Sequence, residues 1–258
     1  ETGIALFYVD PFPRDSKRQG AWMSNLQRAG FKNGKWQIPH VINAGNFTPP
    51  IETPDGTVPA LLTLDEVLTV FHELGHGLHG ILTKVRYRSL SGAETAWDAV
   101  ELPSQINERW ATLPEVLDVY AKHYKTGERI PSALVEKVRQ AENFQAGLLG
   151  LRQVSLGVLD FSWYARNLKD IAHPDDVGAW EKTAMSSYRL VPVPDGAMMS
   201  PQFSHIFGGG YAAGYYSYKW ADVLAADAFS LFEKNGVFDR ETSMRFRKEI
   251  LEKGRTEE

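Results

Sequence analysis

The chain has 258 residues, of which 43% are hydrophobic and 23% are charged, a composition typical of one large or two small globular domains. A net charge of -4, no basic run and no apolar stretch of about 20 residues lead us to expect neither a nucleic-acid nor a membrane partner. Because cysteine is absent, disulfides and thiolate ligands are excluded, and a metal ion would have to be bound by His, Asp or Glu.

The first 62 residues predict a small β-rich part. Residues 4–9 are apolar and β-branched at the ends of the run, which favours a strand. Residues 16–29 are polar and predict a short helix or a loop. Asn33 and Gly34 are typical of a hairpin turn. An extended segment is predicted over 37–47, a loop over 48–59 and a further strand over 58–62.

Residues 63–82 predict one amphipathic helix, around which the chain is organised. We expect Thr63 to cap its N-terminus and Glu66, three residues later, to complete a capping box. Glycines lie inside the segment at positions 75, 77 and 80. Because each glycine in a helix interior costs about 1 kcal/mol relative to alanine, they indicate close packing or a functional site.

This helix carries His72, Glu73 and His76 in the pattern H-E-x-x-H. Histidines four residues apart project from one face, about 6 Å apart along the axis, so both can bind one zinc ion. Glu73 can then reach a metal-activated water as the general base of a metallopeptidase. The five-residue pattern also occurs by chance, and a single histidine more often packs or hydrogen-bonds, so a third ligand is needed.

Glu101 is the best candidate for the third ligand. It lies 25 residues after His76 (101 minus 76), at the start of a second predicted helix that begins near residues 98–99. A His₂Glu set with one open position is a known arrangement of catalytic zinc. A glutamate at a helix start also interacts favourably with the helix dipole, without any metal. Spacing alone does not choose between this structural role and metal binding. Neighbouring candidates are Asp98, Gln105 and Glu108 as partners of the histidines, and His79 as a competing ligand.

The rest of the chain is predominantly helical. Helices are predicted over 132–143, 144–168, 176–188, 211–234 and 240–252. The predicted fold class is therefore mainly α with a small β-sheet. We expect one domain over 1–258, with a small β-rich part over 1–62 and a helical part with the metal site over 63–258.

A second group of candidate residues is His205 with Tyr211, Tyr215 and Tyr218. The tyrosines are spaced i, i+4 and i+7, so one face of the predicted helix would present three phenols. Such a stripe is usually core, but the small residues around it predict a narrow channel or a close helix contact equally well. A phenol beside the polarised carbonyl would stabilise the oxyanion formed during hydrolysis.

Three segments carry a resemblance to a known family: FHELGHGLHGIL, WDAVELPSQINERW and FSHIFGGGYAAGYYSYKWADVLAADAF. Together with FYVDPFPR and KRQGAWM, they make the whole chain similar to the thimet-oligopeptidase family of zinc metallopeptidases, among its oligopeptidase A-like and peptidyl-dipeptidase-like members. The resemblance implies a zincin-like H-E-x-x-H catalytic domain that hydrolyses short unstructured peptides. DAVELPSQ favours the oligopeptidase and FGGGYAAGYY the dipeptidase, so the motifs do not separate the two.

The resemblance also implies a role for each candidate residue. One Zn²⁺ per chain would be bound by His72, His76 and Glu101. Glu73 would be the general base, and Tyr218 would stabilise the oxyanion, a role in which we also expect His205 to act. His205, Tyr211 and Tyr215 would bind the substrate backbone.

Family members are much longer, so we expect this chain to be the C-terminal catalytic part of a cytoplasmic protein. Its expected partners are short peptides and the N-terminal region of the same protein. The main alternative is a catalytically silent peptide-binding fragment, and a third possibility is a zinc hydrolase that cleaves a non-peptide amide.

Overall fold

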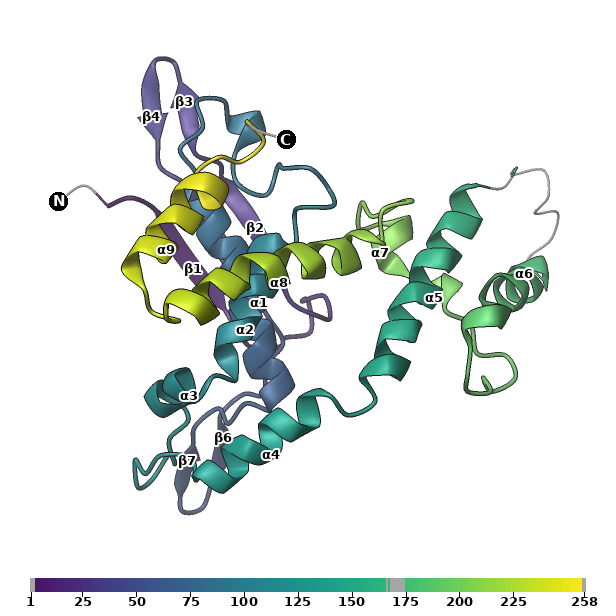
Figure 1. Ribbon diagram of the computed structural model, residues 1–258, viewed down its shortest axis with the longest axis horizontal. Coiled ribbons are helices and arrows are strands. Elements are labelled where there is room, and N and C mark those ends of the chain that lie inside the picture. The colour runs from purple at the N-terminus through teal and green to yellow at the C-terminus, as the bar shows by residue number, and fades with distance from the viewer. Residues whose placement is uncertain (1–2, 166, 168–174, 257–258) are drawn as a thin grey trace. The chain divides into compact units, whose positions relative to one another are not determined.

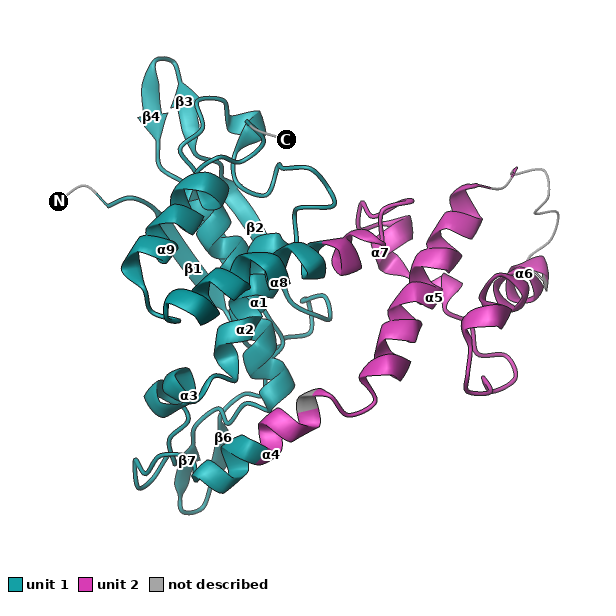
Figure 2. Ribbon diagram, in the orientation of Figure 1, with its two compact units in different colours: residues 1–136, 221–258 teal, residues 137–220 magenta. Residues whose placement is uncertain are grey.

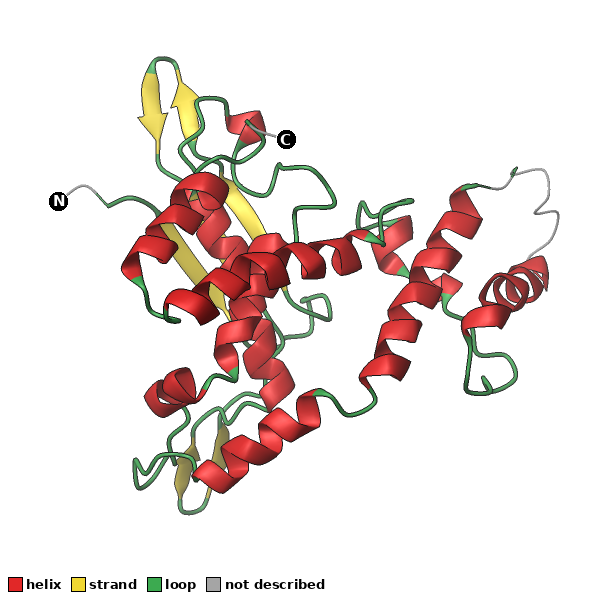
Figure 3. Cartoon of the chain, viewed as in Figure 1, coloured by secondary structure: helices red, strands yellow, loops and turns green. Residues whose placement is uncertain are grey.

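The computed structural model describes residues 3–165, 167 and 175–256. Within them the chain is mainly helical with three small sheets, which confirms the predicted balance of helix and strand (Figures 1 and 3). The chain divides into two compact units (Figure 2). The first unit comprises residues 1–136 and 221–258, and the second comprises residues 137–220. That the whole chain forms one catalytic domain remains a prediction.

The largest sheet of the first unit has three strands in the order β1-β5-β2. Strand β1 (Leu6–Asp10) pairs in parallel with β5 (His40–Ala44), and β2 (Trp22–Gln27) pairs with β5 from the other side in antiparallel. The strands predicted over 4–9 and within 37–47 are therefore confirmed. The helix or loop predicted over 16–29 is wrong, because pairing with β5 overrides the weak local preference of this polar segment.

Two hairpins complete the β structure. Strands β3 (Gly30–Lys32) and β4 (Lys35–Gln37) are joined by Asn33 and Gly34, whose φ angles of 51° and 76° confirm the predicted turn. Strands β6 (Ile51–Thr53) and β7 (Gly56–Val58) form a hairpin where a loop was predicted. The prolines that suggested a loop lie before, between and after these strands, so they remove no hydrogen bond from the ladder. Of the strand predicted over 58–62, only Val58 lies in a strand, as the last residue of β7.

Helix α1 (Leu64–Leu82) is the centre of the first unit. The predicted capping box is formed: Thr63 Oγ1 accepts from the Glu66 amide at 3.2 Å, and Glu66 Oε2 accepts from the Thr63 amide at 2.8 Å. Each interior glycine of α1 allows a close approach. A Cβ on Gly80 would lie 3.0 Å from Val41 of β5, and one on Gly75 would lie 2.6 Å from the Ser104 Cα. Helix α1 therefore packs against the sheet on one side and against a second helix on the other.

That second helix is α2 (Leu102–Ala111), which begins slightly later than predicted. It shares an apolar core with α8 (Ser217–Asn235), built mainly from Ile106, Trp110, Phe229 and Phe232. The other helical elements of this unit are α3 (Pro114–Tyr120), the short η1 (Arg88–Leu90), α9 (Arg240–Phe246) and the π-helical turn that follows it (Arg247–Leu251).

The second unit is built around α5 (Ala146–Tyr164). Its other helices are α4 (Ser132–Glu142), which begins in the first unit, α6 (Asp175–Met185), η3 (Ser186–Tyr188), η4 (Ser200–Gln202) and α7 (Ser204–Phe207). The helix predicted over 144–168 matches α5, and the end predicted at Leu168 lies outside the described residues. Among the helices that the structure describes, none is both long and apolar enough to cross a membrane.

Candidate active site

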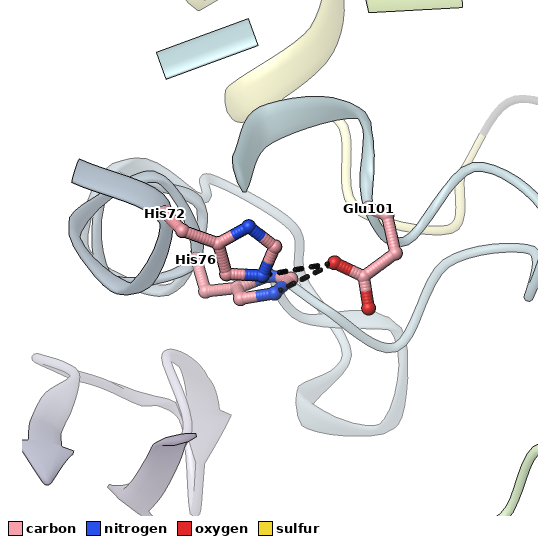
Figure 4. Close-up of side chains that lie close together, drawn as sticks. All are labelled: His72, His76 and Glu101. Carbon is pink, nitrogen blue, oxygen red and sulfur yellow. Dashed lines mark ion pairs between the residues drawn. The ribbon is translucent and has the colours of Figure 1, made fainter. Parts of the chain in front are cut away.

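Three side chains of the first unit converge beside α1, as Figure 4 shows. Glu101 Oε2 lies 3.3 Å from His72 Nε2 and 3.1 Å from His76 Nε2. The three atoms lie within 4.8 Å of one another. These are the histidines of the H-E-x-x-H pattern and the glutamate chosen as the best third ligand, so the structure brings all three together. Their role as metal ligands remains a prediction.

The packing of α1 on α2 produces this convergence. His72 and His76 lie on one face of α1, with their ring centroids 5.0 Å apart. Glu101 is the N-cap residue of α2, so the position of that helix determines the position of Glu101. Because Gly75 has no side chain, the first turn of α2 approaches the α1 backbone between the two histidines. The glycine that interrupts the apolar pattern of α1 is therefore what admits the glutamate.

Two further side chains fix the orientation of this group. Glu108 Oε1 lies 2.6 Å from His72 Nδ1, which leaves the Nε2 atom of His72 turned toward Glu101. The Ser104 hydroxyl, fully buried, donates to Glu101 Oε2 at 2.8 Å. Such contacts hold a ligand's tautomer and ring plane before a metal arrives. Glu108 was among the predicted partners of the histidines, and partner roles for Asp98 and Gln105 remain predictions.

Ser104 was missed by the sequence argument. A hydroxyl three residues after Glu101, in the first turn of the helix that Glu101 caps, was the available signal. Its position follows from helical geometry once the helix is known to begin at Leu102. The same spacing analysis that placed the histidines could therefore have found it.

The donors fit a zinc ion by distance and by chemistry. Ligand atoms around a tetrahedral zinc with bonds of about 2.0–2.1 Å lie about 3.3 Å apart. The two nitrogen-to-oxygen distances at Glu101, 3.1 and 3.3 Å, match that separation. The His₂Glu set is also one that catalytic zinc uses, with a further coordination position left for water or substrate.

The electrostatics agree with a cation site. Burial acts to lower the pKa of His72, but its contacts with Glu101 and Glu108 outweigh burial and raise that pKa to about 10. For Glu101, burial acts in the opposite direction, and its contacts with the two histidines prevail and lower its pKa. The group therefore favours positive charge at the point where the three side chains meet.

Glu73 has the environment of a proton carrier. Its side chain is buried, and its Oε2 atom has no hydrogen-bond partner among the described residues. Burial raises the pKa of this carboxyl, against the opposing effects of His76 and His72. A carboxyl whose pKa is raised toward the working pH is a stronger base than an exposed one, which suits it to accept a proton during a reaction.

His79, the competing ligand, is not part of the group. It is buried one turn beyond His76, and neither of its ring nitrogens has a hydrogen-bond partner among the described residues. Burial lowers its pKa to about 4, so the ring is neutral near pH 7. Among the described His, Asp and Glu side chains, the one cluster able to hold a metal comprises His72, His76 and Glu101.

The predicted aromatic group is assembled in the second unit. The His205 ring lies 5.9 Å from Tyr211, 5.7 Å from Tyr215 and 5.9 Å from Tyr218, measured between centroids. Tyr211 and Tyr218 stack at 5.1 Å, and the Tyr215 hydroxyl donates to Gln153 Oε1 at 3.2 Å. The four side chains form one cluster, but the predicted stripe of three phenols on one helix face is wrong, because Tyr211 and Tyr215 precede α8. Because this cluster and the proposed metal ligands belong to different units, a shared site remains a prediction from the sequence.

The helix predicted to begin at Tyr211 begins instead at Ser217. Ala213 has a φ of 52°, a left-handed conformation that interrupts a right-handed helix. Asp160 of α5 stabilises this turn, because its carboxylate accepts hydrogen bonds from the Ala213 and Tyr215 amides, both at 2.8 Å. Asp160 is fully buried, and the sequence analysis did not identify it. The available signal was that it is the one acidic residue in an otherwise apolar helical segment.

Comparisons with known proteins give a consistent result. The model of peptidase family M3 matches residues 1–258. The chain is 46% identical to oligopeptidase A of Escherichia coli (strain K12) over 257 residues, covering 98% of this chain and 36% of that protein. It is 42% identical to dipeptidyl carboxypeptidase of the same strain, covering 99% of this chain and 37% of that protein. It is 41% identical to a probable cytosolic oligopeptidase A of Arabidopsis thaliana, covering 97% and 36%. The chain thus spans little more than a third of the length of the curated relatives it matches.

Proposed function

The chain belongs to peptidase family M3, and on this basis we propose that it is the catalytic part of a zinc-dependent peptidase that hydrolyses short unstructured peptides. The observation that carries the proposal is the convergence of His72 Nε2, His76 Nε2 and Glu101 Oε2 beside the buried carboxyl of Glu73. A zincin-like arrangement, with H-E-x-x-H on α1 and a glutamate from α2, is part of the same proposal.

His72, His76 and Glu101 would hold the zinc ion, one per chain. When bound, zinc supplies Lewis-acid polarisation of the scissile carbonyl and lowers the pKa of a water molecule that it activates. The side chains must first release their protons to the solvent, because a metal binds only the deprotonated ligands. Glu108 and Ser104 would keep the ligands in place through their contacts with His72 and Glu101.

Glu73 would act as the general base and then as the general acid. Its carboxylate takes a proton from the attacking water and passes it to the nitrogen of the leaving amine. Its raised pKa and its unpartnered oxygen support this role, since the group is neither fixed in an ion pair nor fully hydrated. The carbon–nitrogen bond breaks as the amine receives that proton, so the products are a carboxylate and a free amine.

The aromatic cluster would complete the site. Tyr218 would donate its phenolic hydrogen to the oxyanion that develops on the scissile carbonyl, with His205 as a second donor. Tyr211 and Tyr215 would bind the substrate backbone together with His205. The ring of Tyr218 contacts the rings of the other three residues, so the position of each ring depends on its neighbours. These contacts support a common function for the cluster.

Two relatives differ in name in a way that bears on the products. One is an oligopeptidase and another a dipeptidyl carboxypeptidase, so cleavage within a peptide and release of C-terminal dipeptides are both compatible with the family. A cytoplasmic location remains our proposal. The relative named a probable cytosolic oligopeptidase A supports it, whereas another relative is named an organellar oligopeptidase A.

The test combines zinc content with digestion of a short peptide by this chain and by its Glu73→Gln variant. We expect both proteins to bind one zinc ion and only the parent to cleave, because glutamine cannot carry the proton. Product masses will distinguish internal cleavage from dipeptide release. A folded parent that binds no zinc, or a Glu73→Gln variant with near-normal turnover, would contradict the proposal.

The alternative is a catalytically silent peptide-binding fragment. The observation that favours it is that the chain corresponds to 36% of the length of its oligopeptidase A relative. Binding of the peptide by the parent with zinc bound but without cleavage would select this alternative.

A further inference from the structure

Helix α5 holds the backbone turn that lies between the tyrosines of the aromatic cluster. Fully buried Asp160 accepts from the Ala213 amide through Oδ1 and from the Tyr215 amide through Oδ2, both at 2.8 Å. The next residue of α5, Phe161, stacks on Tyr216 with ring centroids 5.9 Å apart. All of these residues belong to the second unit. Two consecutive residues of one helix therefore hold one turn.

This turn determines where the phenols lie relative to one another. Tyr211 precedes it and Tyr218 follows it, and their rings stack at 5.1 Å with an interplanar angle of 17°. The Tyr211 amide also donates to the His205 carbonyl at 3.0 Å, which joins His205 to the same segment. A displacement of the backbone at residues 213–215 would therefore change both the stack and the contact of His205 with Tyr218.

The conformation of the turn depends on Asp160. Ala213 has a φ of 52°, a left-handed conformation that costs free energy for a residue with a Cβ. Hydrogen bonds from backbone N–H groups to a carboxylate are charge-assisted and therefore stronger than neutral ones. Asp160 uses one oxygen for each amide, so both bonds form only in this arrangement of the backbone. Because a buried carboxylate is itself unfavourable, the fold keeps it only while both amides are in place.

We propose that Asp160 is a positioning residue for peptide hydrolysis, holding the turn of residues 213–215 so that the Tyr218 hydroxyl is aligned with the developing oxyanion. The inference rests on the proposed function, which assigns the oxyanion to Tyr218. Asp160 would touch neither substrate nor metal, because it is fully buried, and its effect would reach the reaction through the tyrosines. A misplacement of about 1 Å can lower a rate by about a hundredfold, so a small shift of the turn is enough.

The main test is a double-mutant cycle on kcat. Asp160→Asn keeps the size of the side chain, but its NH₂ group faces one of the two backbone N–H groups, so one hydrogen bond is lost. We expect kcat to fall by about 10- to 100-fold while the zinc content stays that of the parent. In a Tyr218→Phe protein the same change should lower kcat by less than about threefold, because no hydroxyl is left to align. An equal fall in both backgrounds, or an Asp160→Asn protein with the parent's kcat, would overturn the positioning role and leave the peptidase proposal intact.

Glu181→Gln is the matched control for a loss of stability. Glu181 is also a buried carboxylate of the second unit, and it accepts from the Met199 and Ser200 amides at 2.8 and 2.7 Å. Neither of these amides belongs to the turn of residues 213–215. We expect Glu181→Gln to lower the midpoint of thermal unfolding, as Asp160→Asn does, and to keep the parent's kcat at temperatures where both proteins are folded. A comparable fall of kcat in Glu181→Gln would assign the effect to general destabilisation and overturn the specific role of Asp160.

A spectroscopic measurement separates this inference from the proposed function. In protein labelled at the tyrosine rings, the stacked rings of Tyr211 and Tyr218 give signals that depend on each other's ring current, and single Tyr→Phe variants assign them. Asp160→Asn should shift both signals and Glu181→Gln should leave them in place, with Tyr120 of α3 as the unaffected reference. Such shifts in a protein that cleaves nothing would support the control of the turn by Asp160 while the peptidase proposal fails. Unchanged signals in a folded Asp160→Asn protein would overturn the inference alone.

Discussion

Replacing Gly75 with alanine should weaken both the fold of the first unit and its affinity for zinc. In an isolated helix this change would stabilise by about 1 kcal/mol, because glycine has the lower helix propensity. Here the new Cβ would lie against the Pro103 carbonyl, 2.6 Å from the Ser104 Cα and 2.7 Å from the Pro103 carbonyl carbon. All three contacts are with backbone, so no side chain can rotate away. An overpacking cost of about 3 kcal/mol then exceeds the gain, and leaves a net loss of about 2 kcal/mol.

The loss should be measurable in two ways. A loss of about 2 kcal/mol lowers the midpoint of thermal unfolding by several degrees in a domain of this size. The zinc affinity, measured by competition with a chelating dye, should fall by about tenfold or more, because the displaced helix carries Glu101 away from the histidines.

The matched control is Gly157→Ala in the interior of α5, where an added Cβ meets nothing within 4 Å. This variant should be as stable as the parent or more stable by up to about 1 kcal/mol. If Gly75→Ala unfolded at the parent's midpoint and bound zinc equally well, the close approach of α2 to α1 would not be what assembles the ligands.

Three further changes test other parts of the argument. Tyr218→Phe should reduce kcat by about 10²–10³ with little change in KM, since the lost hydroxyl acts on the oxyanion; an effect on KM alone would assign Tyr218 to substrate binding. Glu108→Gln should weaken zinc binding by about tenfold to a hundredfold while the fold persists, and an unchanged affinity would remove Glu108 from the support of His72. Acid should destabilise the second unit through Glu181, because hydrogen bonds from Met199, Ser200 and Arg189 outweigh burial and lower its pKa. This stabilisation is complete above the usual value of 4.5 and is lost as the pH falls through the lowered pKa, so Glu181→Gln should flatten the dependence of the unfolding free energy on acid pH.

The features predicted correctly from the sequence are those encoded within a few neighbouring residues. The capping box of Thr63 and Glu66 and the turn at Asn33 and Gly34 each depend on local geometry. Strand β2 was missed because its residues become a strand only by pairing with β5. The start of α8 was misplaced for a similar reason, since the turn before it is stabilised by Asp160, which is distant in the sequence.

The same distinction between local and long-range determinants applies to the candidate site. The spacing of His72 and His76 on one helix face is local, and it was predicted. The choice of Glu101 over its neighbours depends on how α2 approaches α1, and the residues alone left that choice open. The contact between Glu108 and His72 depends on the same packing, because the two residues are 36 positions apart in the chain.

The discontinuous first unit has a consequence for the order of folding during synthesis. The Lys84 amide donates to the Glu252 carbonyl at 3.0 Å, and the Arg255 amide donates to the Leu90 carbonyl at 2.9 Å. The apolar face of α2 is covered by Phe229 of α8. A ribosome releases α1 and α2 long before these partners emerge, so both helices stay incompletely packed until residues 229–255 have been synthesised. The three proposed zinc ligands therefore gain their final support only after translation has passed α9, and a chain cut short before that point would lack it.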